Sequence, residues 1–397
     1  MRLGFYYHTP VSVDDEQLFT AGYLGCFLAE LAAHVDELVL FMHETSTDDP
    51  AMDFRLTPSN IRFVSLGVKP KAVVRAFWGG SIIAPVTEEL RSCDLMLVRA
   101  PTHLFVAWWR LCVRNGILML PLVVGDYRAG NPNLPFLFPK KQLVQFLNWW
   151  IDWHERYCLR GKTVLLNSSA LAEKYRPVAS RVHEVRTTTL TASSFFMRLD
   201  TCGGEVINIL YAGRYSWEKG LRELLRAFIL LVREKGIDAS LHFAGWEDTN
   251  GLSIEEEICR LATDQGVADR VIFHGRKKVG SELNALYRMA DFYVIPSYAE
   301  GFPRTIWEAM ANSCPVIATR VGAIPTYLQT GRHALLVPPK DVAALLEAMT
   351  EIIDNREQRQ SLIREGFRLA RNNTLEISCR ELVSILFNET EKGQIEE

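Results

Sequence analysis

The sequence predicts an α/β protein built from two doubly wound parallel-sheet domains in tandem. Short uncharged apolar runs alternate with longer amphipathic segments, which is the pattern of buried parallel strands connected by helices. The alternation stops over residues 188–205, which are rich in Ser, Thr and Gly, and then starts again. At 397 residues the chain has room for about two or three domains of ~150 residues. We therefore predict domains at 1–190 and 206–374, a linker at 191–205, and a C-terminal helix at 375–397 that crosses back to the first domain.

The first predicted domain starts with the apolar run LGFYY and continues as strands separated by helical segments. Continuous apolar runs of this kind indicate strands that are buried on both faces. They predict strands at 3–7, 37–42, 61–66, 94–98, 117–124 and 163–167. Helical spacing of apolar residues predicts helices at 16–34, 82–91, 102–115 and 139–160.

The second predicted domain repeats the same alternation. Its strands are expected at 208–213, 240–245, 271–275, 291–296, 315–319 and 334–338. Its helices are expected at 219–235, 253–265, 282–290, 304–312, 341–354 and 355–372. Doubly wound domains bind ligands beyond the carboxyl ends of their strands, so these loops are the first place to look for a site.

The composition excludes several classes of protein. The net charge is −3, whereas a general nucleic-acid binder is usually strongly basic. The eight cysteines form no CxxC pair, so we expect reduced thiols in a cytoplasmic protein and no metal site. The N-terminus MRLGFYYHTP does not resemble a signal peptide, and the apolar stretch at 116–125 is about half a membrane span.

The segment SYAEGFPRTIWEAMANSCPVIATRV, residues 297–321, is the most informative in the chain. It follows a predicted strand and contains two glutamates, Glu300 on the loop and Glu308 about one turn into the next helix. A strand-to-helix turn presents free backbone N–H groups to an anion or a hydroxyl-rich ligand. Ionised carboxylates accept hydrogen bonds from sugar or ribose hydroxyls. The alternative is a capped helix with solvated acids.

The segment NILYAGRYSWEKGLRELL, residues 208–225, places two cations at a second strand-to-helix turn. Arg214 and Lys219 precede the predicted helix, where helix N–H groups add to their positive charge. Such a loop suits a diphosphate. The alternative is that both side chains are solvated loop charges.

Together these segments resemble the C-terminal domain of GT-B-fold glycosyltransferases, in particular the large retaining family 4 (group 1 glycosyltransferases). The resemblance covers roughly 206–350 and rests on four ordered blocks: AGRYSWEKG, PSYAEGFPRTIWEAMA, CPVIATRVGAIP and ALLVPPKD. The sequence departs from the family pattern at Gly322-Ala323, at Thr326 and at Pro303-Arg304. The resemblance implies the GT-B architecture, in which two Rossmann-like domains face each other across a cleft.

The resemblance also implies roles for residues of the second domain. Arg214 and Lys219 would clamp the donor diphosphate, Glu300 would contact the transferred sugar, and Glu308 would bind the nucleotide ribose. Backbone groups of the intervening loop would face the sugar and phosphates; this loop comprises Gly301, Phe302, Pro303 and Arg304. We expect Glu300, Arg214, Lys219 and His103 to be the catalytic residues.

The first domain resembles the family more weakly. Gly22 or its neighbours would take the place of the family's glycine-rich loop near the donor phosphates. His103, four residues after the strand-end Arg99, is the candidate for the family's catalytic-site histidine, although it could equally make a helix-start or core contact. Arg99 and Asp126 are candidates for binding the acceptor, and Asp126 could instead cap the next segment.

The implied activity is the retaining, metal-independent transfer of a sugar from a UDP- or GDP-linked donor to a hydroxyl of a glycan or lipid-linked acceptor. No cofactor is expected, and the sequence contains no Asp-x-Asp metal handle. Base choice would depend on a loop near residues 276–279. Another GT-B enzyme, such as a sugar-nucleotide epimerase, or a non-catalytic nucleotide-sugar-binding subunit are the alternatives. A dinucleotide oxidoreductase is disfavoured because no GxGxxG follows either first strand.

Residues 102–162 combine aromatic and basic side chains. Five of the nine Trp lie there, and the window from Arg99 to Lys162 holds nine Lys or Arg against three acids. Such a surface suits an anionic membrane, which a polysaccharide or glycolipid pathway on the inner face of the membrane would require. The alternatives are that these Trp pack in the core or stack on an oligosaccharide.

Overall fold

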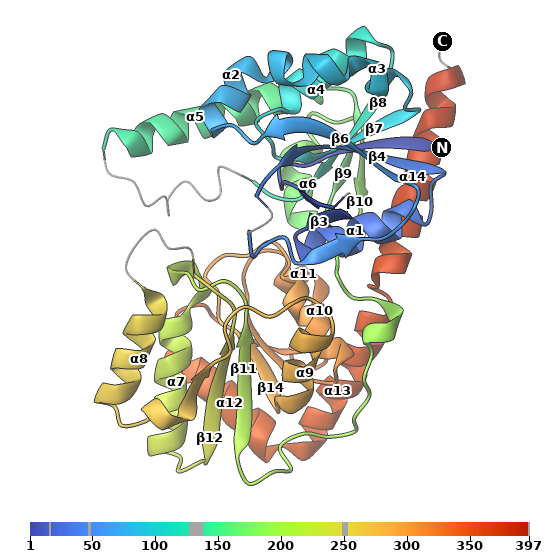
Figure 1. Cartoon of the computed structure of the whole chain (residues 1–397). Coiled ribbons are helices and arrows are strands. Elements are labelled where there is room, and N and C mark those ends of the chain that lie inside the picture. Colours follow the sequence, from blue (N-terminus) through green and yellow to red (C-terminus); the bar gives the residue numbers. More distant parts are fainter. Residues whose placement is uncertain (16, 47–48, 127–137, 248–252, 396–397) are drawn as a thin grey trace. The chain divides into compact units, whose positions relative to one another are not determined.

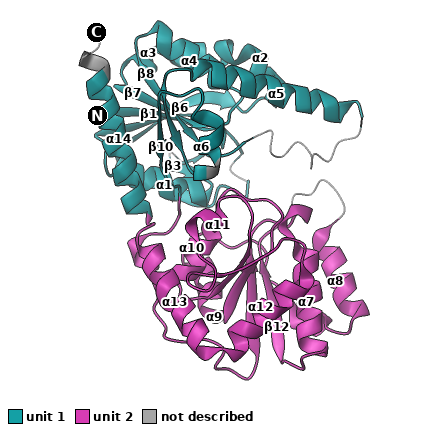
Figure 2. Cartoon of the chain, turned by 180° about the vertical axis from the view of Figure 1, so that it is seen from behind, with its two compact units in different colours: residues 1–187, 375–397 teal, residues 188–374 magenta. Residues whose placement is uncertain are grey.

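The computed structural model describes residues 1–15, 17–46, 49–126, 138–247 and 253–395. The chain divides into two compact units (Figures 1 and 2). Unit 1 comprises residues 1–187 together with 375–397, and unit 2 comprises residues 188–374. Each unit has the α/β fold that the alternating apolar and amphipathic segments predict.

Unit 1 is built on a seven-stranded, all-parallel sheet. The strands are, from one edge to the other, β10 (Arg181–Glu184), β9 (Thr163–Leu166), β8 (Leu118–Val123), β7 (Leu95–Ala100), β1 (Arg2–Tyr6), β4 (Glu37–Glu44) and β6 (Ile61–Val68). All six residues of β7 are buried, which explains the apolar run Leu95–Val98 at its start; Arg99 follows this run within the strand.

Helices cover both faces of this sheet and close two separate cores. One core packs α1 (Gly22–Ala32) and the C-terminal helix α14 (Leu375–Ile395) against the sheet. The other core involves α2 (Ala72–Ile83), α3 (Thr87–Arg91), α4 (Phe105–Arg114), the end of α5 (Lys140–Cys158) and α6 (Ser169–Tyr175). Figure 1 shows α14 beside the N-terminal strands although it ends the chain.

The helix predicted at 16–34 is wrong in its first turn and a half. The segment before α1 forms two antiparallel strands, β2 (Ser12–Asp14) and β3 (Gln17–Thr20), and β3 also pairs with β5 (Phe54–Leu56) in a small separate sheet. Asp15 has a left-handed backbone (φ 43°), which turns the chain between the two strands. Helix α1 begins only at Gly22.

Unit 2 is built on a six-stranded, all-parallel sheet. Its strand order is β13 (Val271–Phe273), β12 (Ala239–Ala244), β11 (Ile207–Ala212), β14 (Phe292–Ile295), β15 (Val316–Thr319) and β16 (Leu335–Val337). The helices are α7 (Leu221–Arg233), α8 (Ile254–Asp264), α9 (Ser281–Met289), α10 (Arg304–Ala311), α11 (Ile324–Tyr327), α12 (Val342–Asp354) and α13 (Arg356–Arg371).

Residues 191–205, expected to be a linker, lie within unit 2. Arg198 joins this segment to unit 2, because its guanidinium donates hydrogen bonds to the backbone carbonyls of Tyr287, Arg288 and Ala290. The segment therefore packs on α9 and on the residue that follows it.

The strand orders locate the positions where ligands of doubly wound sheets bind. In each sheet, the chain runs outward in one direction from a central strand and then returns to the other side of it. This reversal falls between β1 and β7 in unit 1 and between β11 and β14 in unit 2. The loops that follow these four strands form a crevice-type site in such folds.

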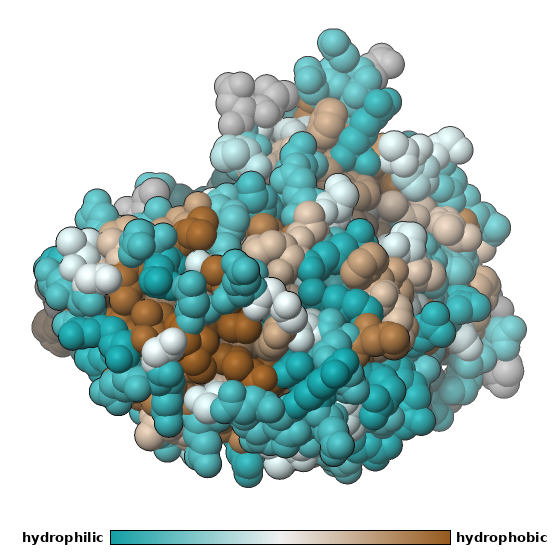
Figure 3. Space-filling view, turned by 90° about the horizontal axis from the view of Figure 1, so that it is seen from below, coloured by the Kyte–Doolittle hydropathy of each residue, from teal (hydrophilic) through white to brown (hydrophobic). Residues whose placement is uncertain are grey.

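Exposed hydrophobic residues are not confined to one unit. Figure 3 shows a face on which hydrophobic residues gather among hydrophilic ones. Because most folded proteins expose some apolar surface, exposure alone does not mark a binding site. Among the described residues, no helix has the length and apolarity needed to cross a membrane.

Candidate functional site

The loops after β11 and β14 in unit 2 touch each other. The Tyr298 N–H donates to the Glu218 carbonyl (2.7 Å). Gly220 lies at the end of the first loop with φ 67°, and a Cβ there would stand 2.1 Å from the Pro296 carbonyl oxygen. Only glycine accepts both the left-handed backbone and this close approach. The glycine of the AGRYSWEKG block therefore lets the two loops pack together.

Lys219 and Glu300 form an ion pair across these loops. The Lys219 ammonium donates to Glu300 Oε1 at 2.7 Å, and the Ser297 hydroxyl donates to the same oxygen at 2.7 Å. The two charged side chains are 17% and 11% exposed. The two predicted residues from separate motifs, 81 positions apart, thus meet at one point.

A second glycine holds the loop of Glu300 in place. Gly322 has φ 54°, and a Cβ there would stand 1.8 Å from the Glu300 carbonyl oxygen. The next residue, Ala323, donates its N–H to the Gly301 carbonyl (2.9 Å). The CPVIATRVGAIP block therefore supports the PSYAEGF block from the neighbouring strand.

The loop then enters α10, which begins at Arg304. Pro303 precedes it with an extended backbone, so the N–H groups of the first turn point out of the helix end. Phe302 packs on Trp307 (ring centroids 4.6 Å apart) and on Tyr327 (5.1 Å). These contacts fix the loop between Glu300 and the helix.

Arg214 lies on the same loop as Lys219 and is more exposed. Its side chain is 48% exposed and approaches Glu218 at 3.9 Å. The Tyr211 hydroxyl donates to the Arg214 carbonyl (2.8 Å), which fixes the backbone beneath the side chain. About half of the Arg214 side chain is therefore open to solvent at this loop.

Glu308 lies deeper than its predicted role suggests. The residue is 4% exposed. One carboxylate oxygen accepts from the Thr189 hydroxyl (2.6 Å) and the other from the Tyr287 hydroxyl (3.1 Å), while Arg304 stands 3.8 Å away. Each oxygen retains a second lone pair, so a ribose hydroxyl could still donate to it. The sequence contains no signal for Thr189 or Tyr287, since neither belongs to a motif.

Two of the predicted residues of unit 1, Arg99 and His103, lie at the carboxyl end of β7. Arg99, in β7, is 7% exposed, and its guanidinium lies 4.7 Å over the Tyr7 ring. His103 follows β7, and burial, reinforced by the charges of Arg75 and Lys69, lowers its pKa to about 4. The imidazole of His103 is therefore neutral at pH 7.

Gly22 and Asp126 have other contacts in unit 1. The Gly22 N–H, expected near the donor phosphates, donates to the Asp53 carboxylate (2.7 Å) and so helps to begin α1. Asp126 pairs with Lys174 (3.0 Å), which also contacts Asp152. Both contacts favour a structural part for these two residues.

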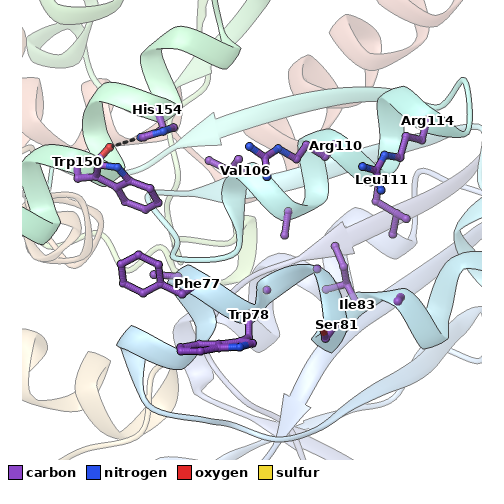
Figure 4. A pocket seen from close by; sticks show the side chains of 15 residues that line it. Phe77, Trp78, Ser81, Ile83, Val106, Arg110, Leu111, Arg114, Trp150 and His154 are labelled. Atoms are coloured by element: carbon purple, nitrogen blue, oxygen red, sulfur yellow. Dashed lines mark hydrogen bonds between the residues drawn. The ribbon is translucent and has the colours of Figure 1, made fainter.

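The aromatic residues of 102–162 divide between the core and the surface. Trp108 is fully buried between Tyr6 and Phe41, which contradicts a membrane-facing position for that side chain. Trp149 and Trp153 on α5 are 45% and 44% exposed. A groove of about 460 Å³ lies between α2, α4 and α5 (Figure 4). Its lining includes Phe77, Trp78, Arg110, Arg114, Trp150 and His154.

No group of three or more His, Cys, Asp or Glu side chains suited to a metal ion occurs among the residues that the structure describes. The candidate site in unit 2 instead presents two cations, Lys219 and Arg214, together with a helix N-terminus and one carboxylate. This set of groups is suited to a diphosphate joined to a hydroxyl-bearing group.

Two Rossmann-like units, with this loop site in the second, define the GT-B class of fold. Residues 204–368 match the family described as "Glycosyl transferases group 1". The D-inositol 3-phosphate glycosyltransferase of Corynebacterium efficiens is 31% identical over 178 residues, which are 45% of this chain and 42% of that protein. The match thus spans less than half the length of this relative.

Solved structures with the same fold match nearly the whole chain. Anabaena Alr3699/HepE in complex with UDP and glucose has a TM-score of 0.75 at 13% identity, covering 98% of this chain and 100% of that one. WaaG, a glycosyltransferase involved in lipopolysaccharide biosynthesis, has a TM-score of 0.69 at 12% identity, covering 96% and 99%. At these identities the likeness establishes the GT-B fold.

Proposed function

We propose that the protein is a retaining glycosyltransferase that moves a sugar from a nucleoside-diphosphate sugar to a hydroxyl of a glycan or lipid-linked acceptor without a metal ion. The observation that carries the proposal is the meeting of Lys219 and Glu300 at the reversal point of the unit 2 sheet. Both residues lie within the part of the chain that matches the group 1 glycosyltransferases, and this supports the proposal.

The donor diphosphate would bind to the loop after β11. Lys219 ends that loop and Arg214 begins it, so two cations and the N-terminus of α7 can surround one diphosphate. Lys219 has three donor hydrogens, so it can hold Glu300 and a phosphate oxygen together. Glu300 would accept hydrogen bonds from hydroxyls of the transferred sugar, and Glu308 would accept one from a ribose hydroxyl.

We assign the base-binding region to the loop at 276–279. Arg276 lies with its guanidinium 4.7 Å over the ring of Trp246, which follows β12. A flat cation on an indole ring offers a stacking surface for a base. UDP is the first candidate because HepE, which has the same fold, was solved with UDP; GDP is the alternative.

The chemistry would be a substitution on one face of the sugar. The bond from the anomeric carbon to the diphosphate breaks, and the bond to the acceptor oxygen forms on the same side. The acceptor's proton passes to an oxygen of the leaving diphosphate. Lys219, Arg214 and the helix N–H groups stabilise the charge that develops on that diphosphate, so the contribution of the protein is mainly electrostatic.

His103 and Arg99 would act on the acceptor side of the reaction. The pKa of His103, lowered to about 4, keeps its imidazole uncharged near neutral pH. A neutral imidazole can both donate and accept hydrogen bonds, which suits it to orient a hydroxyl.

The acceptor would be presented at a membrane surface. Helix α5 exposes apolar side chains at helical spacing, and α2 adds further aromatic residues beside the groove (Figure 4). These side chains are Leu143, Phe146, Trp149, Trp153 and Tyr157 on α5 and Phe77 and Trp78 on α2. Arg110 and Arg114 line the same groove and would attract anionic headgroups. WaaG, which shares the fold, is involved in lipopolysaccharide biosynthesis, and this supports an acceptor of this kind.

The test of the proposed function is turnover. The protein is incubated with UDP- and GDP-sugars and a set of glycan and lipid-linked acceptors, and the release of nucleoside diphosphate and the anomeric configuration of the product are measured. We expect release that depends on acceptor and a product with retained configuration. Inverted product contradicts the mechanism, donor interconversion without transfer indicates an epimerase, and donor binding without turnover indicates a non-catalytic subunit.

The membrane surface has its own test with a matched control. The variant with Trp149→Ser and Trp153→Ser is compared with Phe387→Ser, because Phe387 is 44% exposed on another helix, α14. We expect the wild type and Phe387→Ser to co-sediment with phosphatidylglycerol vesicles and the double variant to remain in the supernatant. Equal sedimentation of both variants contradicts this assignment.

A further inference from the structure

Four strands of unit 1 end at one place and bring basic side chains together. Tyr6 of β1 pairs with Val98 of β7, so the residues that follow β1 lie beside the end of β7. Strands β4 and β6 continue the same edge beyond β1. The residues at or just beyond these strand ends are His8, His43, Lys69 and Arg99, and Arg75 joins them from α2.

Two of these cations are buried and have no carboxylate partner among the described residues. Arg75 and Arg99 are each 7% exposed. Arg75 Nε donates to the Pro70 carbonyl (3.1 Å), but its NH1 group has no hydrogen-bond partner in the ranges that the structure describes. Arg99 lies over the Tyr7 ring, and its Nε likewise has no acceptor in the described part of the chain. Buried charges are normally paired, because leaving them unpaired is costly.

The surroundings of this cluster are of one sign. Burial lowers the pKa of His8 to about 3, and the nearby basic groups that lower it further include Lys69, Arg75 and Arg99. Burial also lowers the pKa of His43 to about 4, where Arg75 and Lys69 act in the same direction. The side-chain charges that contribute most to both shifts are those of basic residues.

Two other shielded cations among the described residues are neutralised by carboxylates. Arg359 in unit 2 is 5% exposed and pairs with Asp200 at 2.7 Å. Lys174 in unit 1 stands between Asp126 and Asp152. The strand-end cluster differs from these two cations because no described residue supplies it with an anion.

We propose that the cluster of Arg75, Arg99, Lys69, His8 and His43 binds an anionic group, a phosphate or a carboxylate, carried by the acceptor. That the anion belongs to an acceptor rests on the proposed function, whereas the presence of an anion site does not depend on it. The guanidinium groups supply charge-assisted hydrogen bonds, and the imidazoles supply neutral ones. The site also lies at the reversal point of the unit 1 sheet, where ligands of doubly wound domains bind.

The test uses a variant in which the two cations of the donor site are removed, so that an added anion cannot bind there. In an Arg214→Ala, Lys219→Ala background, thermal unfolding is followed while sodium phosphate or sodium acetate replaces sodium chloride at constant ionic strength. We expect a saturable rise of the midpoint with at least one of the two anions. A rise with phosphate alone indicates that the acceptor carries a phosphate. A rise with acetate alone indicates that it carries a carboxylate. No saturable rise with either overturns the proposal.

Substitutions then locate the binding. Arg99→Gln removes one charge-assisted hydrogen bond and is expected to weaken anion binding about tenfold. The control is Arg62→Gln, because Arg62 is an exposed cation at the opposite end of β6. Equal affinity of Arg99→Gln and Arg62→Gln overturns the proposal.

A measurement on the wild-type protein covers the case in which Arg99→Gln does not fold. The imidazole resonances of His8 and His43, assigned through His→Gln variants, should move on anion addition, and their pKa values should rise. The resonances of His34 and His333, which lie outside the cluster, should not shift on anion addition. No movement of His8 or His43 overturns the proposal. Nucleotide binding is not involved, so a failed donor assay leaves this result interpretable.

Discussion

Replacing Lys219 with alanine should weaken the binding of a bare nucleoside diphosphate and also destabilise unit 2. Lys219 is 17% exposed and its partner Glu300 is 11% exposed, with 2.7 Å between nitrogen and oxygen. Without Lys219, the Glu300 carboxylate keeps only the hydrogen bond from Ser297 in place of two. The substitution therefore acts on the free protein and on the complex at the same time.

The magnitude follows from the geometry. At 2.7 Å two unit charges attract by ~6 kcal/mol at an effective dielectric constant of ~20, before the cost of removing both from water. The net value of a hydrogen bond between charged groups is ~1.5–3 kcal/mol. We therefore expect the free energy of unfolding to fall by ~1.5–3 kcal/mol. The dissociation constant of UDP or GDP should rise by roughly 10- to 150-fold, if one such bond to phosphate is lost.

Calorimetric titration and urea unfolding separate the two effects. In the Lys219→Ala, Glu300→Gln variant no unpaired carboxylate remains, so stability should recover while nucleotide affinity stays weak. Lys235→Ala, at an exposed position just after α7, is the control and should change neither quantity. Unchanged nucleoside-diphosphate affinity in Lys219→Ala would refute the reasoning.

Three further predictions concern the loops, the pH dependence and metals. Gly220→Ala should destabilise far more than Gly236→Ala in urea unfolding, because both glycines have φ near 66° but only Gly220 has a carbonyl 2.1 Å from the added Cβ; equal losses would contradict the loop packing. Stability should fall as pH drops from 6.5 toward 4, because burial lowers the pKa of His8 to about 3 and of His103 to about 4, so the unfolded chain takes up these protons first. The expected loss is ~2 kcal/mol per histidine by pH 5, and a slope that His103→Gln leaves unchanged would contradict it. Transfer activity should survive EDTA, whereas loss that Mg²⁺ or Mn²⁺ restores would contradict the metal-free mechanism.

Much of unit 2 can be predicted from the sequence because its strands are buried on both faces. The run NILYAG predicts a strand at 208–213, and the structure has β11 at Ile207–Ala212. The Glu300 loop and the Lys219 turn were also recognisable from their motifs. Their direct pairing was not, because it joins residues 81 positions apart through the packing of two loops.

Unit 1 was less predictable for three physical reasons. The small sheet of β2, β3 and β5 consists of strands of three or four residues, which are too short for a periodicity to define them. The basic cluster depends on a meeting of four strand ends, and Lys69 and Arg75 belong to no motif. Trp108 and Trp149 lie in similar aromatic sequences, and only packing separates the buried ring from the exposed one.

The central claim is that unit 2 binds a nucleoside-diphosphate sugar through the loops after β11 and β14. The most direct measurement is a thermal-shift panel of UDP, GDP, ADP, CMP and their common sugar conjugates, run on the wild type and on Arg214→Ala, Lys219→Ala. The account predicts that the diphosphates of one base raise the unfolding midpoint of the wild type and not that of the variant. A panel in which no nucleotide raises the wild-type midpoint, or in which the variant responds equally, would contradict it.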